Sequence, residues 1–540
     1  MLTLRFPDQS EIQIPKGMTI AQLAASQDHS ASLAGGILNG KVHDLNYRLN
    51  KSGAFEWIRL DSLIGQMMTE RTLSFLLITA VRLCLNGTDV LIEHSLAGGL
   101  YGSLIRSESI TPSELEQVRT KIQEMIDHHE PILRRVVSKA EAVAHFEALG
   151  MQDKASLLRQ RTSAKCSIYT CAGVDDYFYG VMLPDASWIR QFTLQAVHQG
   201  FWFSTEKAFV DQPKLFEVYR QFEQRGRETG ISMISQLNEK IREGYLPQII
   251  AQNEKRVAQD LGKLADQIAA HPNLKIVLIA GPSSAGKTTF SRRLALALRE
   301  RGKDPIAISM DDFFLNREDS PRLPDGTHDY ENIECLDLKL FNASMEALIS
   351  GQPVVLPTYD FKLGEKRFIR EPLTLKTDQI LILEGLHALN PRSSEKIAES
   401  AKFRVYINAL THLNLDRHNR ITTTDYRLIR RMTRDFQFRG RSVQDTLQGW
   451  EQVKAGEDRY IYPYQEQADF LFNTSMDYEM PILKTILAPL LDQVPVDVPE
   501  YIEANRIRRL LAYFDAGDPA FVPHDSILAE FIGGSVFEEY

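Results

Sequence analysis

The residues that most clearly define a chemistry in this sequence are Gly281-Pro-Ser-Ser-Ala-Gly286-Lys287-Thr288. This run fits the pattern G-x-x-x-x-G-K-[ST], and it lies between an apolar stretch, Ile276–Ala280, and a stretch with helical spacing, Thr289–Leu298. A buried strand, a glycine-rich loop and a helix are the context of a phosphate-binding loop, or P-loop. Glycines let consecutive backbone N–H groups surround phosphate oxygens, and the helix N-terminus adds the positive end of its dipole. The sequence therefore predicts a binding site for a nucleoside triphosphate.

Within this loop we expect the phosphates and a magnesium ion to contact different side chains. Lys287 would reach the β- and γ-phosphates, and the Thr288 hydroxyl would bind Mg²⁺. The residues predicted to contact ATP are Gly281, Ser283, Ser284, Ala285, Gly286, Lys287, Thr288 and Thr289. The competing interpretation, a glycine-rich turn with an incidental lysine, leaves the flanking strand and helix unexplained.

Two acidic residues follow apolar stretches that indicate further parallel strands. Pro305–Met310 leads into Asp311, and Gln379–Leu383 leads into Glu384. The carboxyl ends of such strands face the nucleotide crevice. Asp311 could accept the proton of an attacking hydroxyl, and Glu384 would hold Mg²⁺ or its water shell. The alternatives are an N-cap for the next helix at Asp311 and a solvent-facing turn acid at Glu384.

An arginine-rich segment follows between residues 417 and 441, with eight arginines and no lysine. Arg427, Arg431 and Arg434 fall on one helical face at spacing i, i+4, i+7. Such a face repels itself unless anions neutralise it, and a triphosphate matches the geometry of arginine forks. We predict Arg431 and Arg434 as catalytic groups on a mobile lid that closes over the phosphates and excludes water. The alternative is a solvated basic helix that binds RNA.

The composition is that of an ordinary globular protein with several domains. The 540 residues are 43% hydrophobic and 25% charged, and the formal net charge of −9 argues against non-specific binding of nucleic acid over the whole surface. The N-terminus has no signal-peptide pattern, and no apolar run approaches the length of a membrane span. Four cysteines without regular spacing indicate a reducing compartment, namely Cys84, Cys166, Cys171 and Cys335. We expect a cytoplasmic protein that is not bound to a membrane.

The chain divides into segments that we predict as residues 1–60, 61–225, 226–273, 274–480 and 481–540. In the first segment, alternation predicts a hairpin, followed by a helix and a strand. The residues are Leu2–Phe6 and Glu11–Ile14 for the hairpin, Thr19–Ala24 for the helix and Gly36–Gly40 for the strand. This order resembles the TGS domain, a small ubiquitin-like α+β module that heads threonyl-tRNA synthetases.

The second segment resembles the editing domain that follows TGS in threonyl-tRNA synthetase, an α+β domain. The resemblance rests on the runs Thr72–Ala80, Val90–Ser95, Gly99–Gly102 and Ser167–Gly173. That family edits with an H-x-x-x-H and a C-x-x-x-H pair, and the matching positions here are Arg71, Phe75, Cys171 and Asp175. A guanidinium and a phenyl ring can neither bind a metal nor relay a proton, so we expect no hydrolytic editing. The segment would serve as a scaffold for the rest of the chain or, alternatively, keep a surface for RNA or a small ligand.

The third segment, residues 226–273, is predicted to be a helical linker that ends at His271-Pro-Asn273. Its apolar positions keep a spacing of three and four, at Ile250, Val257, Leu261, Leu264 and Ile268. The last segment, residues 481–540, is predicted to be a C-terminal extension.

Residues 274–480 resemble the uridine/cytidine kinase and phosphoribulokinase family. The resemblance rests on motifs in family order, namely Gly281–Thr288, Ser309–Phe314, Pro357–Phe361, Glu384–Leu386 and Arg430–Arg441. With the TGS and editing-like segments in front, the whole chain is similar to bacterial uridine kinase-like nucleoside kinases. The resemblance implies a P-loop α/β fold, a parallel sheet with helices on both faces.

This resemblance also assigns roles to individual residues. It implies that Asp311 is the base and that Arg431 and Arg441 contact substrate or phosphate. Tyr359 would line the nucleoside pocket. Glu331 falls where the family places the acid that grips the ribose hydroxyls, with Asp329 as the alternative.

The sequence predicts ATP- and Mg²⁺-dependent phosphorylation of a nucleoside 5′-hydroxyl but leaves the acceptor open. Gly364, Phe314 and Gly449 stand where uridine kinases place polar groups that read the base, and such losses change discrimination strongly. Glu384-Gly-Leu-His387 is similar to phosphoribulokinase, so a sugar-phosphate kinase is one alternative. An RNA-associated, nucleotide-sensing regulator is another. The family resemblance and the long helices also suggest a homo-oligomer.

Overall fold

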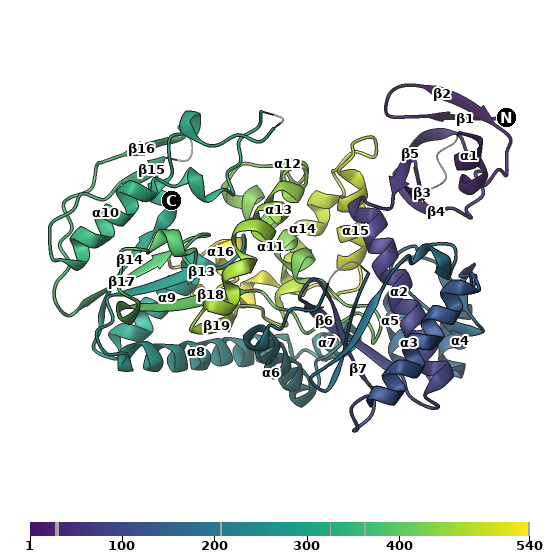
Figure 1. The fold of residues 1–540 in the computed structure, drawn as a ribbon, viewed down its shortest axis with the longest axis horizontal. Coiled ribbons are helices and arrows are strands. Elements are labelled where there is room, and N and C mark those ends of the chain that lie inside the picture. The colour runs from purple at the N-terminus through teal and green to yellow at the C-terminus, as the bar shows by residue number, and fades with distance from the viewer. Residues whose placement is uncertain (28–31, 206–207, 325, 361–362, 538–540) are drawn as a thin grey trace.

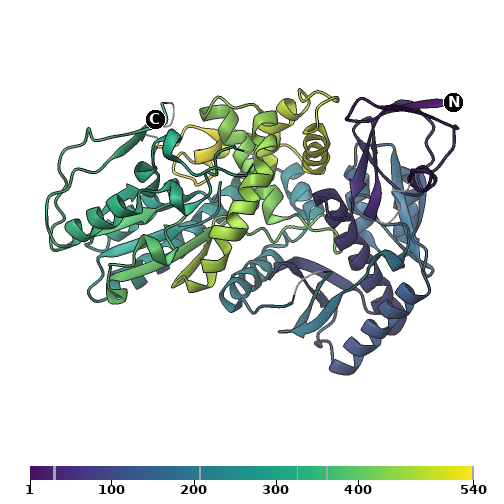
Figure 2. The ribbon, with the colours of Figure 1, turned by 45° about the horizontal axis from the view of Figure 1, so that its top comes forward.

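The computed structural model describes residues 1–27, 32–205, 208–324, 326–360 and 363–537. The molecule is elongated (Figure 1). The N-terminal domain and an α+β region lie at one end, and the sheet that carries the P-loop lies toward the other, with several helices between them (Figures 1 and 2).

Residues 1–60 form a small α+β domain. Its elements are β1 (Leu2–Arg5), β2 (Glu11–Ile14), α1 (Ile20–Ser26), β3 (Leu33–Leu38), β4 (Lys41–Asp44) and β5 (Gly53–Arg59). The sheet order is β2-β1-β5-β3-β4, and β1 runs parallel to β5. A capping box between Thr19 and Gln22 begins α1, which packs its buried Leu23 into the core. The predicted hairpin, helix and strand are confirmed.

The editing-like region is built around α2 (Leu63–Cys84) and two antiparallel sheets. One sheet has the order β10-β9-β8, with β8 (Leu133–Ser138), β9 (Lys165–Cys171) and β10 (Val174–Asp176). The other has the order β11-β12-β7-β6, with β6 (Val90–Leu96), β7 (Gly99–Leu104), β11 (Thr193–Val197) and β12 (Gly200–Ser204). The region's longer helices are α3 (Pro112–Asp127), α4 (Lys139–Ala148) and α5 (Gln152–Gln160).

The four positions that would carry an editing site are engaged in packing or ion pairs. Arg71 donates from Nη1 to the carbonyl oxygen of Val181, and Phe75 is fully buried against Phe178. Cys171 is also buried, and Asp175 forms ion pairs with Arg135 and His145. The side chains at these four positions therefore contact other protein groups.

The predicted linker consists of helices that start earlier than expected. They are α6 (Pro213–Thr229), α7 (Ile234–Arg242) and α8 (Leu246–Ala270). The predicted boundary at residue 225 therefore falls inside α6. All five apolar positions predicted for the long helix are buried on α8. Its C-cap is His271, followed by Asn273 with a positive φ.

The P-loop region is a five-stranded parallel sheet in the order β14-β17-β13-β18-β19. Its strands are β13 (Ile276–Ala280), β14 (Asp304–Ser309), β17 (Gln379–Glu384), β18 (Lys402–Asn408) and β19 (Phe470–Asn473). Alternate β13 residues face opposite sides: Val277 packs in a cluster with α8 and α9 (Lys287–Arg299), and Leu278 in a cluster with α10 (Leu338–Ile349). Helices thus cover both faces of the sheet, as predicted.

The remaining strands and α-helices of the described residues are a short hairpin and six helices. They are the hairpin β15 (Thr358–Asp360) and β16 (Glu365–Arg367), and the helices α11 (Thr423–Phe438), α12 (Val443–Gln448), α13 (Trp450–Tyr460), α14 (Glu479–Leu491), α15 (Tyr501–Leu511) and α16 (Ala529–Ile532). α14 begins inside the predicted kinase segment, and α16 returns to lie beside α11 (Figure 1). The C-terminal extension is therefore part of the P-loop region's core.

The editing-like region and the P-loop region share a buried ionic network. Lys154 on α5 is fully buried and lies 2.7 Å from Asp176 of β10 and 3.1 Å from Asp416. His418 Nδ1 lies 2.7 Å from the same Asp176 carboxylate. Burial works against the charged form of Lys154, but the two carboxylates together raise its pKa. The network therefore fixes the segment that precedes α11 to the editing-like region.

The described residues include neither a membrane-spanning helix nor a disulfide bond. None of the described helices is both long enough and apolar enough to span a membrane. The four cysteines are all free thiols.

Replacing Lys154 by methionine should destabilise the protein by about 3 to 5 kcal/mol, because it leaves two buried carboxylates without their shared cation. Chemical denaturation of the purified variant measures this loss. Lys263→Met is the matched control, because Lys263 is 65% exposed and its ion pair with Asp260 is solvated. Equal stability of the two variants would contradict the importance of the network.

Candidate active site

The P-loop follows β13 and turns sharply before α9. Ser284 and Gly286 have φ angles of 60° and 88°, and α9 begins at Lys287. Residues 281–286 are buried, whereas Thr288 is exposed at the start of the helix. The Lys287 ammonium donates to the carbonyl oxygens of Gly281 at 3.0 Å and Pro282 at 3.3 Å. The loop thus has the folded-back shape of a phosphate cradle.

The two predicted carboxylates lie at the same edge of the sheet as the P-loop. Glu384, the last residue of β17, pairs in register with Ile279 of β13 on one side and with Ser309 of β14 on the other. Asp311 lies two residues beyond β14, in the short helix η3 (Met310–Phe313), and its N–H donates to the Ser309 hydroxyl at 3.3 Å. Parallel strands therefore bring Asp311 and Glu384 close to Lys287.

The electrostatics of this trio favour an added cation. Burial, together with Asp311 nearby, raises the pKa of Glu384 to about 7. Burial also raises the pKa of Asp311, and it lowers that of Lys287. The exposed Thr288 hydroxyl and the two carboxylates are hard oxygen donors of the kind that Mg²⁺ prefers. The residues present therefore fit a magnesium ion held by Thr288 and Glu384.

The arginines of α11 divide into two groups, and the first supports the P-loop backbone. Arg427 pairs with Glu457 at 2.5 and 2.6 Å and donates to the Ser283 carbonyl oxygen at 3.0 Å. Arg430 pairs with Glu479 at 2.6 and 2.7 Å and donates to the Ser284 carbonyl oxygen at 3.3 Å. Both arginines are fully buried. The prediction that a triphosphate neutralises Arg427 is wrong, because Glu457 does so.

The arginines of the second group contact the Ser283 side chain or Asp435. Arg431 donates from Nη1 to the Ser283 hydroxyl at 2.7 Å, and Arg434 lies 2.8 Å from Asp435. Arg439, just past α11, is 3.8 Å from the same carboxylate, and the charge of Arg434 lowers its pKa to about 10. Arg431 Nε also lies 3.4 Å from Asp435, so this one carboxylate is shared by three arginines. The positive charge that remains can attract an anion.

The predicted lid corresponds to α11 and the segment that follows it. Buried ion pairs join α11 to α13 and α14, and hydrogen bonds join it to the carbonyl oxygens of Ser283 and Ser284. Arg441 lies beyond the helix with an exposed side chain, and its backbone N–H donates to the Asp435 carbonyl oxygen. The closing movement itself stays a prediction.

Glu331, a residue predicted to hold the acceptor, lies within electrostatic range of Arg431, Lys287 and Asp311. Glu331 packs tightly against α13. A Cβ atom placed on Gly456 would lie only 2.2 Å from the Cβ atom of Glu331. Its Oε2 has no hydrogen-bond partner among the described residues. Burial raises its pKa to about 7, and Arg431 opposes this rise. Asp329, the alternative, accepts a bond from the Asn332 side chain.

Tyr359 and Gly364 lie in the β15–β16 hairpin, and Phe314 packs against Tyr359. The Tyr359 N–H donates to Asp312 at 3.2 Å, and its ring meets Phe314 edge-on at 5.8 Å. Gly364 has a φ of 74° in the hairpin turn, a conformation that favours glycine. Gly449 joins α12 to α13 with an ordinary φ. Phe361, in the same motif, lies outside the described residues.

Three carboxylates at the site were not identified from the sequence. Glu457 accepts from the Ser283 N–H at 2.9 Å, Glu479 neutralises Arg430, and Glu530 accepts from the Thr289 N–H at 3.0 Å. Each is separated from its P-loop or α11 partner by many residues, and none stands in a motif. Local spacing therefore held no signal for them.

Comparisons with known proteins agree with this geometry. Residues 276–480 match the model of the Phosphoribulokinase / Uridine kinase family. The N-terminal part is similar to threonine–tRNA ligases. That of Polaromonas sp. is 28% identical over 205 residues, or 37% of this chain and 32% of the ligase. That of Pelobacter propionicus is 27% identical over 238 residues, or 42% of this chain and 37% of the ligase. The chain spans about a third of the length of these curated relatives.

One similar solved structure is described provisionally as a fructose transport system kinase from Silicibacter sp. TM1040. The match covers 39% of this chain and 98% of that protein, with 20% identity and a TM-score of 0.30. A second, described provisionally as a uridine kinase from Bacillus stearothermophilus, matches 40% and 98%, with 19% identity and a TM-score of 0.28. These likenesses are too distant to argue from. The family match and the site geometry together support a P-loop kinase, a class that in general uses ATP and Mg²⁺.

Replacing Glu331 by glutamine should flatten the pH dependence of stability in the ligand-free protein. Because folding raises the pKa of Glu331 from 4.5 to about 7, the folded state retains a proton that the unfolded chain has already released. This contribution to stability is present below the lower value and is lost as the pH rises through the higher one. Denaturant unfolding at intervals between about pH 4 and about pH 8 measures the slope.

Glu334→Gln is the matched control for this series, since Glu334 is 55% exposed and pairs with Arg392 at the surface. A pH slope that is the same in Glu331→Gln and in the native protein would show that Glu331 does not carry the raised pKa.

Proposed function

We propose that this protein transfers the γ-phosphate of ATP to the 5′-hydroxyl of a nucleoside. The observation that carries the proposal is the convergence of Lys287, Asp311 and Glu384 at one sheet edge, with Glu331 close enough to interact electrostatically with Lys287 and Asp311. Donor and acceptor groups thus lie within electrostatic range of one another. The family match of residues 276–480 supports the phosphotransferase class.

Each residue has a distinct part in the transfer. Asp311 would accept the proton of the attacking hydroxyl, and its raised pKa makes it a better base near neutral pH. Lys287, Arg431 and Arg434 would stabilise the charge that develops on the transferred phosphoryl group. Thr288 and Glu384 would hold Mg²⁺, which supplies charge neutralisation at the phosphates.

The acceptor side supports a ribose-containing substrate. The free Glu331 Oε2 can accept a hydrogen bond from a sugar hydroxyl, and a buried carboxylate without a partner is otherwise costly. Tyr359 would form one wall for the base. With Gly364, Phe314 and Gly449 at the base-reading positions, the identity of the base stays open.

One observation favours a second candidate, a sugar-phosphate kinase. Arg431, Arg434 and Arg439 share the single carboxylate of Asp435, and the mutual repulsion of Arg434 and Arg439 would be relieved by an anionic acceptor. In either case we propose the editing-like region as a scaffold, because the Lys154 network binds it to the segment before α11. RNA binding and self-association stay predictions.

The test is a panel of acceptors offered to the purified protein with radiolabelled ATP. The proposal expects label on one or more nucleosides, whereas the second candidate expects label on a pentose phosphate. ATP hydrolysis without labelling of any acceptor would contradict both.

Asp311→Ala should lower kcat on the true acceptor by about 10² to 10⁴, the usual contribution of a positioned base. Lys287→Ala should abolish measurable turnover, because a phosphate contact of the donor is lost. Asp319→Ala, at an exposed residue in the same segment, is the matched control and should keep full activity. Near-normal rates in Asp311→Ala would refute its assignment as the base.

A further inference from the structure

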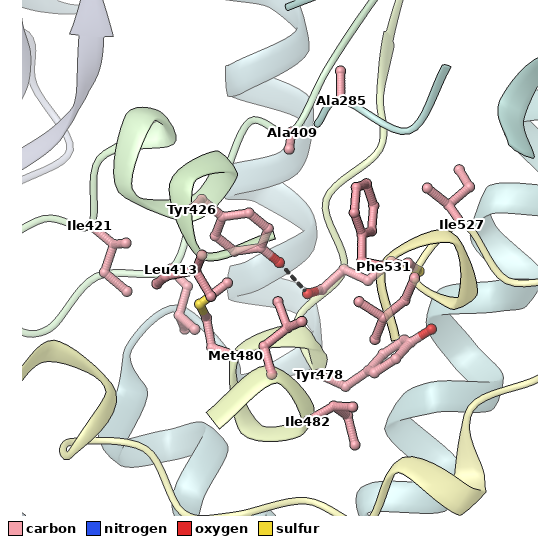
Figure 3. Close-up of a cluster of buried hydrophobic side chains, with 14 of the residues drawn as sticks. Ala285, Ala409, Leu413, Ile421, Tyr426, Tyr478, Met480, Ile482, Ile527 and Phe531 are labelled. Atoms are coloured by element: carbon pink, nitrogen blue, oxygen red, sulfur yellow. Dashed lines mark hydrogen bonds between the residues drawn. The ribbon is translucent and has the colours of Figure 1, made fainter. Parts of the chain in front are cut away.

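The C-terminal segment Ser526–Ile532 is built into the wall of the P-loop. Ile527 and Phe531 are fully buried in one cluster with Ala285 of the P-loop, Tyr426 of α11 and Tyr478 beside α14 (Figure 3). A Cβ placed on Gly286 would lie 2.5 Å from the Ile527 Cγ2. The segment therefore touches the loop at the point where α9 begins.

Several contacts fasten this segment in place. The Ser526 hydroxyl is 3.1 Å from the Tyr478 hydroxyl, and the Gln437 side chain donates to the Ile532 carbonyl oxygen at 3.1 Å. The Arg430 guanidinium lies over the Phe531 ring at 5.0 Å. Because its apolar side chains are buried, moving the whole segment would expose several of them to water. The segment is thus held against the P-loop by buried side chains.

Within this segment, Glu530 points toward the P-loop. Its carboxylate accepts a hydrogen bond from the Thr289 N–H at 3.0 Å, in the first turn of α9. Backbone N–H groups at this end of a P-loop helix are the donors that a nucleotide's phosphates use. Glu530 is partly exposed, so its side chain can rotate while Phe531 and Ile527 stay buried.

We propose that Glu530 competes with the nucleotide for the first turn of α9, so that ATP binds only after the Glu530 carboxylate has moved aside. The proposal rests on the proposed function, in which this loop binds ATP. The carboxylate gives the Thr289 N–H a charged partner in the ligand-free protein, and it repels the phosphates of an arriving nucleotide. Glu530 thereby weakens and tunes the affinity for ATP.

The test measures binding of Mg²⁺–ATP by isothermal titration calorimetry, without any acceptor. Glu530→Gln removes the charge and Glu530→Ala also removes the hydrogen bond, so both should bind ATP about tenfold more tightly than the native protein, since a charge-assisted hydrogen bond is no longer displaced. Asp525→Asn removes the same charge from an exposed residue nearby and should leave the affinity unchanged. Thermal unfolding of the four proteins checks that each is folded.

The outcomes separate this inference from the proposed function. If the native protein binds ATP and the two Glu530 variants bind it equally or more weakly, the competition is refuted and the nucleotide site stands. Weaker binding would instead mean that Glu530 contacts the nucleotide favourably. If neither the native protein nor any Glu530 variant binds a nucleoside triphosphate, the proposed function fails as well.

Discussion

The shape of the site depends on two buried ion pairs, Arg427 with Glu457 and Arg430 with Glu479. Each arginine is neutralised by one carboxylate and also donates to a P-loop carbonyl oxygen, at Ser283 or Ser284. Removing one partner of such a pair leaves a buried charge uncompensated, which is strongly destabilising. The pairs therefore tie the P-loop to α11, α13 and α14, and the phosphate cradle keeps its form without a ligand.

Further contacts join α11 to helices for which the sequence predicted no chemical role. Arg506 on α15 pairs with Asp425 in the first turn of α11, and the Tyr219 hydroxyl on α6 is 3.2 Å from that of Thr423. The segment just before α11 is held by the Lys154 network of the editing-like region. The first turn of α11 thus contacts α6 and α15, and its arginines contact the P-loop. These contacts support the proposal that the editing-like region is a scaffold.

Much of the donor site could be predicted from sequence because its signals are local. The strands β13 and β17 are continuous apolar runs, and their structural bounds match the predicted runs once Glu384 is included in the second. The partners of the arginines could not be predicted, because helical spacing identifies neighbours three or four residues apart, whereas Glu457 comes to Arg427 from another helix. The contact between Glu530 and Thr289 spans 241 residues and is set by packing of the C-terminal extension. For the same reason, the ion pairs that hold α11 could not be predicted, whereas the movement of a lid stays a prediction.

The central claim, that these elements form a kinase acting on a nucleoside, is tested most directly by identifying the product of a complete reaction. The protein is incubated with Mg²⁺–ATP and the nucleoside that it labels, and the product is analysed by mass spectrometry and phosphorus NMR. The account predicts one new phosphate, attached at the 5′ oxygen of the ribose, in equimolar amount with ADP. Orthophosphate as the sole phosphorus product besides ADP, or a phosphate on any other oxygen of the nucleoside, would contradict it.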